Sequence, residues 1–437
     1  MARVFLLLTA FLTFAFCVIL FLTKGFVSYA VFANTFILVL ITSLLIILYL
    51  SSQSGSIISP IGYFILSLLV FVLARPIIGL FLPMQYVEAG FTESYVGVVE
   101  TVAWIGIGLA FIAFGFGLVK PNYVIDKLSQ SSLCFPKSRL IYILLVVASI
   151  GLLIAFLIVS YQKSKIFSEL NYLDALNDQL HSHFFLFFIA KNLVLISLFF
   201  HTSQRAVLFL SLLVFIGSIG FLILGLRGYT VAYFFLFMFF LNERWAINKV
   251  VLLGIMVGLV YIAGVVLEYR VGHAVYDGLG DLIFKVIHQQ GATFEVIYGV
   301  VNYLNEVRSC IGYKEYFNGA DFGSCVDTSR GVFWLQGGFA SSFYAEALYL
   351  GWGVYIVLCF LIGSLLKVLD VLTFLRRLRG ASADFSSIFL FAIIPNLVYF
   401  SRASAFDLIV KFCLLWLILF MVSALWNIFR PKYEVHS

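Results

Sequence analysis

Hydrophobic residues occur along the chain in runs of about 20, separated by short polar stretches. A run of that length crosses about 30 Å of hydrocarbon as a helix, and the alternating short segments typical of a membrane β-barrel are missing from the sequence. The first run continues past Met1 without a small-residue cleavage site, so we expect it to be a retained span. The pattern predicts about twelve spans, near residues 3–23, 29–50, 58–83, 99–119, 140–161, 183–201, 206–226, 228–242, 250–268, 342–366, 384–401 and 405–429.

One polar segment, residues 269–341, is far longer than the others. Its interior predicts an interfacial amphipathic helix, because Phe294, Ile297 and Val301 repeat at helical spacing. Glu295 falls on another face of that helix. Ordered loops of this length are more often functional than decorative, so we favour a substrate-handling lid; a passive cap over the bundle is the alternative.

Composition and charge place the chain in a membrane and orient it. Of its 437 residues 63% are hydrophobic and only 11% are charged, whereas a globular domain carries about 25% charged residues. The net charge of +6 comes mainly from basic residues in short loops on one side, which is the orientation signal of membrane proteins and gives no support to nucleic-acid binding. The residues that mark the cytoplasmic side are Lys120, Lys127, Lys137, Arg139, Arg244, Lys249, Lys367, Arg376, Arg377 and Arg379.

This orientation predicts an all-α polytopic membrane protein, a single transmembrane domain over residues 1–437. An even number of spans places both termini in the cytoplasm. The segment 269–341 then becomes a large extracytoplasmic loop that caps the helical bundle. Cys310 and Cys325 both lie in this loop, and they form a disulfide if it faces an oxidising compartment. No spacing of cysteines and histidines resembles a metal site.

Four arginines come to the same outer level in this topology: Arg75, Arg227, Arg270 and Arg402. Ionisable residues at membrane depth are costly, and a set that meets one interface favours an anionic ligand. The guanidinium fork binds phosphate oxygens in pairs, so a diphosphate at the headgroup level is the natural partner. For any single arginine, contact with lipid headgroups is the alternative.

Catalysis, if present, requires a general base from the long loop or from the segment where the chain returns into the membrane. The candidates are His273, Asp277, Asp281, His288, Glu295 and Glu346. The sequence contains no Gly-rich phosphate loop, and no cytoplasmic loop is long enough for a nucleotide-sugar domain or carries acidic residues paired for a divalent ion. An enzyme of this kind would draw a substrate already activated on a lipid.

The chain resembles the Wzy-type O-antigen polymerases, the oligosaccharide repeat-unit polymerases of bacterial surface polysaccharides. The resemblance is carried by the topology and by three segments: residues 71–76 (Phe-Val-Leu-Ala-Arg-Pro), residues 226–229 (Leu-Arg-Gly-Tyr), and the small and aromatic residues from Gln336 to Gly353 around Ala345-Glu346. It implies a glycosyltransferase of lipopolysaccharide biosynthesis in the bacterial inner membrane. Such an enzyme transfers a growing glycan from undecaprenyl diphosphate to a sugar hydroxyl on the next lipid-linked repeat unit, without metal or cofactor.

The resemblance also implies roles for named residues. Arg227, Arg270 and Arg402 would stabilise the leaving diphosphate, with Arg75 and Arg330 as further substrate contacts. Glu346 would orient or deprotonate the acceptor, a role for which the loop residues His273, His288 and Glu295 are the other candidates. The expected partners are the lipid-linked oligosaccharide donor and acceptor, membrane lipids and a chain-length regulator protein.

Two other functions fit much of the pattern. An O-antigen ligase shares the architecture and the donor but carries a histidine near the end of its large loop, whereas His273 and His288 lie in the first part of residues 269–341. A lipid-linked oligosaccharide flippase has similar length, but it needs short loops on both sides and pseudo-symmetric halves. Both differences favour the polymerase.

Overall fold

The structure is a computed structural model in which every regular element among the described residues is a helix. The expected all-α class is therefore confirmed. Helices satisfy their own backbone hydrogen bonds, which a chain inside hydrocarbon requires. The described ranges are 2–22, 30–53, 55–81, 95–121, 138–167, 183–201, 203–224, 227–245, 293–317, 342–378 and 385–398. Shorter described pieces are 247–248, 250–251, 254–255, 258, 261–262, 280, 286–287, 291, 322, 325–326 and 400.

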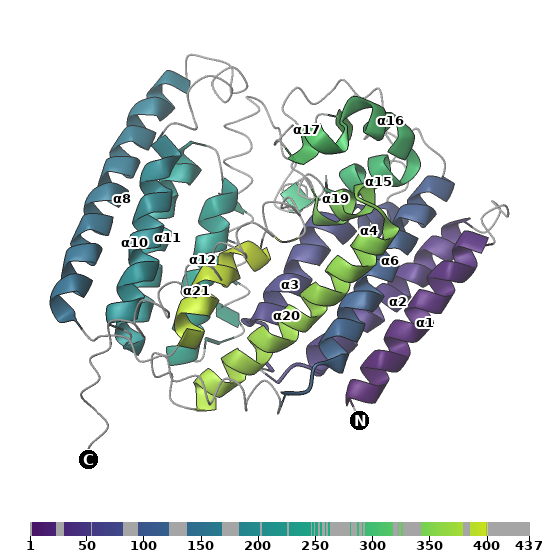
Figure 1. Ribbon diagram of the computed structural model, residues 1–437, viewed down its shortest axis with the longest axis horizontal. Coiled ribbons are helices and arrows are strands. Elements are labelled where there is room, and N and C mark those ends of the chain that lie inside the picture. Colours follow the sequence, from purple (N-terminus) through teal and green to yellow (C-terminus); the bar gives the residue numbers. More distant parts are fainter. Residues whose placement is uncertain are drawn as a thin grey trace.

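The helices form two groups that stand side by side (Figure 1). The first group contains α1 (Ala2–Leu22), α2 (Ala30–Leu50), α3 (Pro60–Leu68), α6 (Tyr95–Leu118) and α20 (Trp352–Leu378). The second group contains α8 (Arg139–Phe167), α10 (Phe184–Phe200), α11 (Gln204–Ile223), α12 (Arg227–Arg244) and α21 (Phe385–Val398). Helix α21 packs on both α12 and α3, so it joins the two groups.

Seven helices in the described part of the chain are long and apolar enough to cross a membrane, and α10 and α21 are shorter apolar helices. They coincide with predicted spans, as does α12. The predicted span at 405–429 lies outside the described residues, and so does most of the one at 250–268. The protein is therefore a multi-pass helical membrane protein.

Helices α6 and α20 approach each other closely where they cross. A Cβ added to Gly363 would overlap the carbonyl oxygen of Ile112, and one added to Gly115 would overlap the carbonyl oxygen of Phe360. Small residues at a crossing let two backbones come together, which is the main source of helix association inside a bilayer. The two glycines therefore set how α20 sits against the first group.

The third predicted span is a helix with a wider turn in its middle. Ser59 caps the start of α3 by accepting a hydrogen bond from the Gly62 amide (3.1 Å), and Pro60 occupies the first turn, where its missing N–H costs nothing. A π-helical turn, η2 (Leu69–Leu73), then leads into α4 (Ala74–Phe81). Such turns insert an extra residue and are frequent at functional sites.

The tenth predicted span, residues 342–366, is wrong in its bounds. The chain breaks at Gly351, whose φ of 124° favours glycine, and the break separates the short helix α19 (Phe343–Tyr349) from α20. Because α20 continues to Leu378, Lys367 and Arg376 lie inside a helix and not in a loop as expected. Both side chains are buried and paired with carboxylates.

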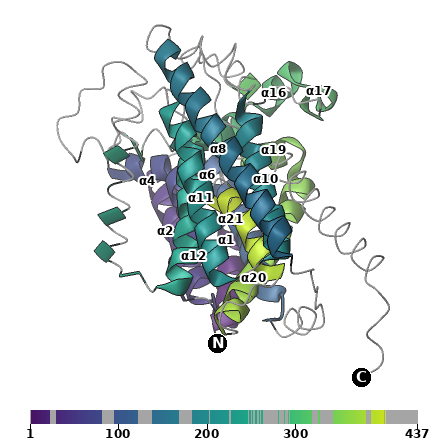
Figure 2. The same ribbon diagram turned by 90° about the vertical axis from the view of Figure 1, so that its left-hand side faces the viewer.

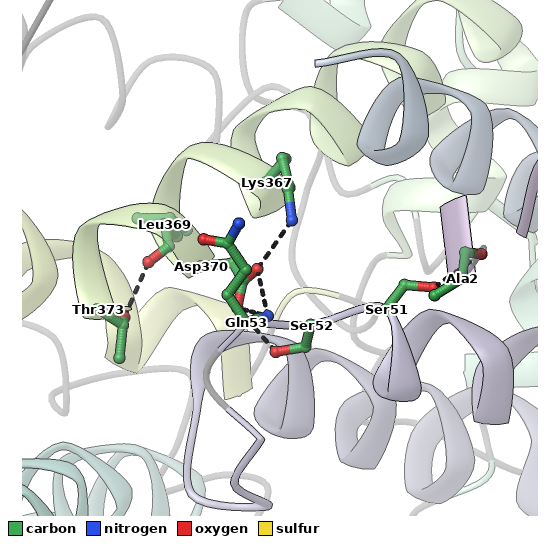
Figure 3. Close-up of polar contacts among 8 residues, drawn as sticks. All are labelled: Ala2, Ser51, Ser52, Gln53, Lys367, Leu369, Asp370 and Thr373. Atoms are coloured by element: carbon green, nitrogen blue, oxygen red, sulfur yellow. Dashed lines mark hydrogen bonds and ion pairs between the residues drawn. The ribbon is translucent and has the colours of Figure 1, made fainter. Parts of the chain in front are cut away.

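Lys367 pairs with Asp370 within α20, and Asp370 also fastens the end of α2 to this helix (Figure 3). Asp370 accepts hydrogen bonds from Lys367 (3.1 Å), from the Ser52 hydroxyl (2.7 Å) and from the Gln53 amide (2.9 Å). Six residues beyond Asp370 in α20, the Arg376 guanidinium donates to Glu243 of α12 (2.6 Å) and to the Ser387 hydroxyl of α21. Through these contacts α20 holds together both helix groups at one end of the molecule, which we call the base end.

Three short helices cover the opposite end: α15 (Thr293–Asn302), α16 (Leu304–Cys310) and α17 (Tyr313–Phe317). We call residues 293–317, with Phe322, Cys325 and Val326, the cap. In both ribbon views α16 and α17 lie at the end opposite to the start of α1, with α19 beneath them (Figures 1 and 2). Disulfide-bonded Cys310 and Cys325 close a loop of the cap.

Helix α15 is not the interfacial helix that its spacing predicts. Every residue from Thr293 to Val300 is buried, Glu295 included, because α15 packs against η2, α6 and α19. The Asn302 amide also donates to the Thr101 hydroxyl of α6 (3.4 Å). Helix α15 is thus inserted among the membrane helices, whereas most residues of α16 and α17 are exposed.

Substituting Gly363 by alanine should destabilise the protein by about 1–3 kcal/mol, because its Cβ would overlap the α6 backbone. Gly353→Ala is the matched control in the same helix, since no atom lies within 4 Å of the added Cβ. That control should leave stability unchanged or raise it by up to about 1 kcal/mol. Thermal unfolding in detergent measures both, and equal midpoints would show that the crossing is not tightly packed.

Candidate functional site

The cap end gathers those predicted site residues whose side chains the structure describes. Arg75 lies in the first turn of α4, Glu295 in α15 and Glu346 in α19. Arg227 is the first residue of α12, and its backbone alone is described. Arg270, Arg330, Arg402, His273 and His288 lie outside the described residues.

Arg75 and Glu295 form a buried ion pair between the third span and the cap. The π-helical turn η2 directly precedes Arg75, and α15 packs against it, which brings the two charges together. Removing two charges from water is costly, and their attraction offsets the cost only when the pair is well formed. The two predicted substrate contacts therefore neutralise each other here, and their pairing attaches α15 to the bundle.

Glu346 is the most deeply buried carboxylate of the site, with 1% of its surface exposed. It lies in the first turn of α19, which begins after Ser342 and ends just before the turn at Gly351. The Tyr316 hydroxyl of α17 donates a 2.5 Å hydrogen bond to its Oε2 atom. This short contact between two buried groups holds the carboxyl group of Glu346 in one orientation.

An aromatic cluster surrounds that hydrogen bond. The rings of Tyr316, Phe322 and Tyr349 lie with their centres 5.3 to 5.9 Å apart. Tyr349 follows Glu346 by three residues, so both side chains lie on the same side of α19. The Tyr349 hydroxyl donates to the Ile311 carbonyl oxygen (2.6 Å), and Arg308 donates to the Tyr349 carbonyl oxygen (3.2 Å).

Burial raises the pKa of the Tyr349 hydroxyl, and neighbouring Tyr313 adds to the rise. A tyrosine hydroxyl is protonated at neutral pH even without this rise, so it can donate its hydrogen bond to Ile311 there. Within the described ranges, no group of three or more histidine, cysteine, aspartate or glutamate side chains is arranged to hold a metal ion.

The comparisons with known proteins identify the family of the chain. The family model described as O-antigen polysaccharide polymerase Wzy matches residues 5–319. The chain belongs to the Wzy family. It is also 34% identical over 400 residues to an O-antigen polymerase of Escherichia coli, and the match covers 86% of each chain. No solved structure matches it.

This Wzy family member carries site residues that sequence reasoning did not select. Tyr316 and Tyr349 hold Glu346 and the end of α19 against the cap, yet neither residue type nor spacing singles them out. One available signal was the position of Tyr316 between Cys310 and Cys325, in a loop that a disulfide would fix. The structure does contain that disulfide.

The ion pair between cap and bundle predicts an unequal response to single and double substitutions. Glu295→Gln leaves the Arg75 charge buried without its carboxylate, so it should lower the free energy of unfolding by about 3 kcal/mol. Replacing both residues with apolar ones of similar size, Arg75→Met with Glu295→Leu, should restore most of that loss. Thermal unfolding in detergent of the two variants checks this. A double variant as unstable as Glu295→Gln would mean that the unpaired charge of buried Arg75 is not the cause of the lost stability.

Proposed function

We propose that the chain polymerises O-antigen repeat units carried on undecaprenyl diphosphate, at the periplasmic face of the bacterial inner membrane. Membership of the Wzy family, with 34% identity to an O-antigen polymerase over most of both chains, is the observation that carries the proposal. The buried carboxylate of Glu346 beneath the cap supplies a group of the kind that this transfer needs.

Two features support the periplasmic placement of the cap. Disulfides persist in oxidising compartments, which include the bacterial periplasm, and the cap contains one. Basic residues lie at the base end. Helix α8 begins there at Arg139, Arg205 is the second residue of α11, and α12 ends there at Arg244. Positively charged loops stay in the cytoplasm, so the two signals agree.

A topology of twelve spans with both termini in the cytoplasm follows from the same reasoning. The seven long helices, α10, α12 and α21 account for ten spans. The remaining two are those predicted at 250–268 and 405–429. The N-terminal helix begins at the base end, in keeping with a cytoplasmic start (Figure 1).

The proposed reaction transfers a glycan between two lipid-linked molecules. A sugar hydroxyl of the acceptor repeat attacks the anomeric carbon of the donor glycan, and the bond from that carbon to the diphosphate oxygen breaks. Its electron pair leaves with the lipid diphosphate, and the hydroxyl proton passes to a base. Glu346 takes the role of that base in the proposal.

The arginines complete the proposed mechanism. The leaving diphosphate gains charge as its bond breaks, and guanidinium groups stabilise that charge without a metal. Arg227, Arg270 and Arg402 take this role, with Arg75, Arg330, His273, His288 and Glu295 as substrate contacts. Because Arg75 is paired with Glu295, its contact with a diphosphate requires that pair to loosen. A chain-length regulator protein remains an expected partner.

The length of the surface glycan tests the function. A strain that lacks the gene should make lipopolysaccharide whose core bears a single repeat unit, because ligation continues while polymerisation stops. Wild-type protein should restore long chains, and Glu346→Gln expressed at the same level should not. A core without any repeat unit in the deletion strain would identify a ligase or a flippase instead. Long chains with Glu346→Gln would remove Glu346 from the mechanism.

The arginines are tested in the same strain. Arg227→Ala and Arg402→Ala should each shorten the glycan to about one unit, since loss of a charge-stabilising donor lowers turnover about 10²-fold or more. The combination Arg75→Met with Glu295→Leu, which keeps the cap attached, separates anchoring from substrate binding. Shortened chains at normal protein level support a ligand role for Arg75 or Glu295, and full-length chains contradict such a role for both.

A further inference from the structure

The hydrogen bond between Tyr316 and Glu346 joins two groups that are almost fully buried. Tyr316 is 4% exposed and Glu346 is 1% exposed, and their oxygen atoms are 2.5 Å apart. A buried carboxylate needs hydrogen-bond donors because it has lost its water. The carboxylate has about four acceptor positions, and the bond from Tyr316 occupies one of them and helps to fix its orientation.

Tyr316 comes from an element that cannot hold its own position. Helix α17 has five residues, and helices this short are not stable by themselves. The disulfide between Cys310 and Cys325 closes the segment that contains α17, with a sequence separation of 15 residues. The backbone on both sides of Tyr316 is thereby tied together.

A second attachment positions the same segment on α19. The Tyr349 hydroxyl binds the carbonyl oxygen of Ile311, the residue next to Cys310. The rings of Tyr316 and Tyr349 are in contact, with centres 5.5 Å apart. The disulfide and this attachment therefore act on one rigid piece, and the Tyr316 hydroxyl is the atom of that piece that reaches the carboxylate.

We propose that Tyr316 is a positioning residue for Glu346, and that the Cys310–Cys325 disulfide keeps it in place. The inference rests on the proposed function, in which Glu346 handles the acceptor hydroxyl. A carboxylate that rotates away from the acceptor lowers turnover even when the protein remains folded, because misplacement by about 1 Å can slow a reaction about 10²-fold. Full activity then depends on an oxidised cap.

Two tyrosine-to-phenylalanine variants separate positioning from stability. Tyr316→Phe keeps the ring and removes only the hydroxyl on Glu346. Tyr63→Phe is the matched control, since its hydroxyl is also buried and donates to a backbone carbonyl oxygen, that of Phe235, but it lies on α3 outside the cap and the candidate site. Purified protein in liposomes, supplied with lipid-linked repeat units extracted from the deletion strain, gives kcat and KM, and thermal unfolding gives stability.

Tyr316→Phe should lower kcat at least tenfold with KM changed less than about twofold, whereas Tyr63→Phe should lower the unfolding midpoint and keep kcat per folded molecule. Equal kcat values for Tyr316→Phe and wild type would overturn the proposal. If Glu346→Gln also kept full kcat, the proposed role of Glu346 would fail as well. If kcat falls with Glu346→Gln but not with Tyr316→Phe, this inference is contradicted and the proposed role of Glu346 is not.

The disulfide is tested through its coupling to Tyr316. Removing the bond with Cys310→Ala and Cys325→Ala should lower kcat, and adding Tyr316→Phe to that variant should produce little further loss. Non-additive losses are expected when two changes act through one contact. If the two changes lower kcat by factors that multiply, the proposed link between the disulfide and Tyr316 is contradicted. If the cysteine variant does not fold, dithiothreitol treatment of folded wild type and folded Tyr316→Phe gives the same comparison.

Discussion

A charge inside an apolar helix bundle needs an opposite charge or several hydrogen bonds, and this constraint explains how the described helices are tied together. Arg376 reaches Glu243 on α12, Asp370 reaches the end of α2, and Arg75 reaches Glu295 on the cap. Each of these contacts connects elements that are far apart in the sequence. Apolar packing alone is weakly directional in lipid, so such polar contacts help to specify which helix stands next to which.

The two ends of the molecule use this constraint in different ways. At the base end Arg376 and Asp370 hold α20 to both helix groups, and their partners lie in α12, in α21 and in the turn that follows α2. At the cap end Arg75 and Glu346 find their partners in the cap, which contributes Glu295 and Tyr316. The cap therefore depends on the bundle for its anchoring, and the candidate site depends on the cap for its geometry.

The sequence could predict the spans because a run of about 20 apolar residues has the length and the polarity of a helix that crosses the membrane. It could also single out Glu346 and the cysteine pair by residue type. It could not place Tyr316 on Glu346, 30 residues away, because that contact exists only after α17 has been fixed on α19. Lys367 and Arg376 resemble loop charges until their carboxylates are known, and Glu295 resembles a solvent-facing residue until Arg75 is found beneath it.

Burial of Glu346 also fits the competition that the proposed reaction faces. A glycan on a diphosphate leaving group can be transferred to a sugar hydroxyl or lost to water, and a base open to solvent would promote both outcomes. With Glu346 1% exposed and Tyr316 bound to its Oε2 atom, bulk water does not reach the proposed base freely. Exclusion of water from a closed site suppresses such side reactions and strengthens the electrostatic interactions inside it. Helix α15, which is inserted between the membrane helices and packs on α19, and Tyr316 of α17 both contribute to that exclusion where α19 begins.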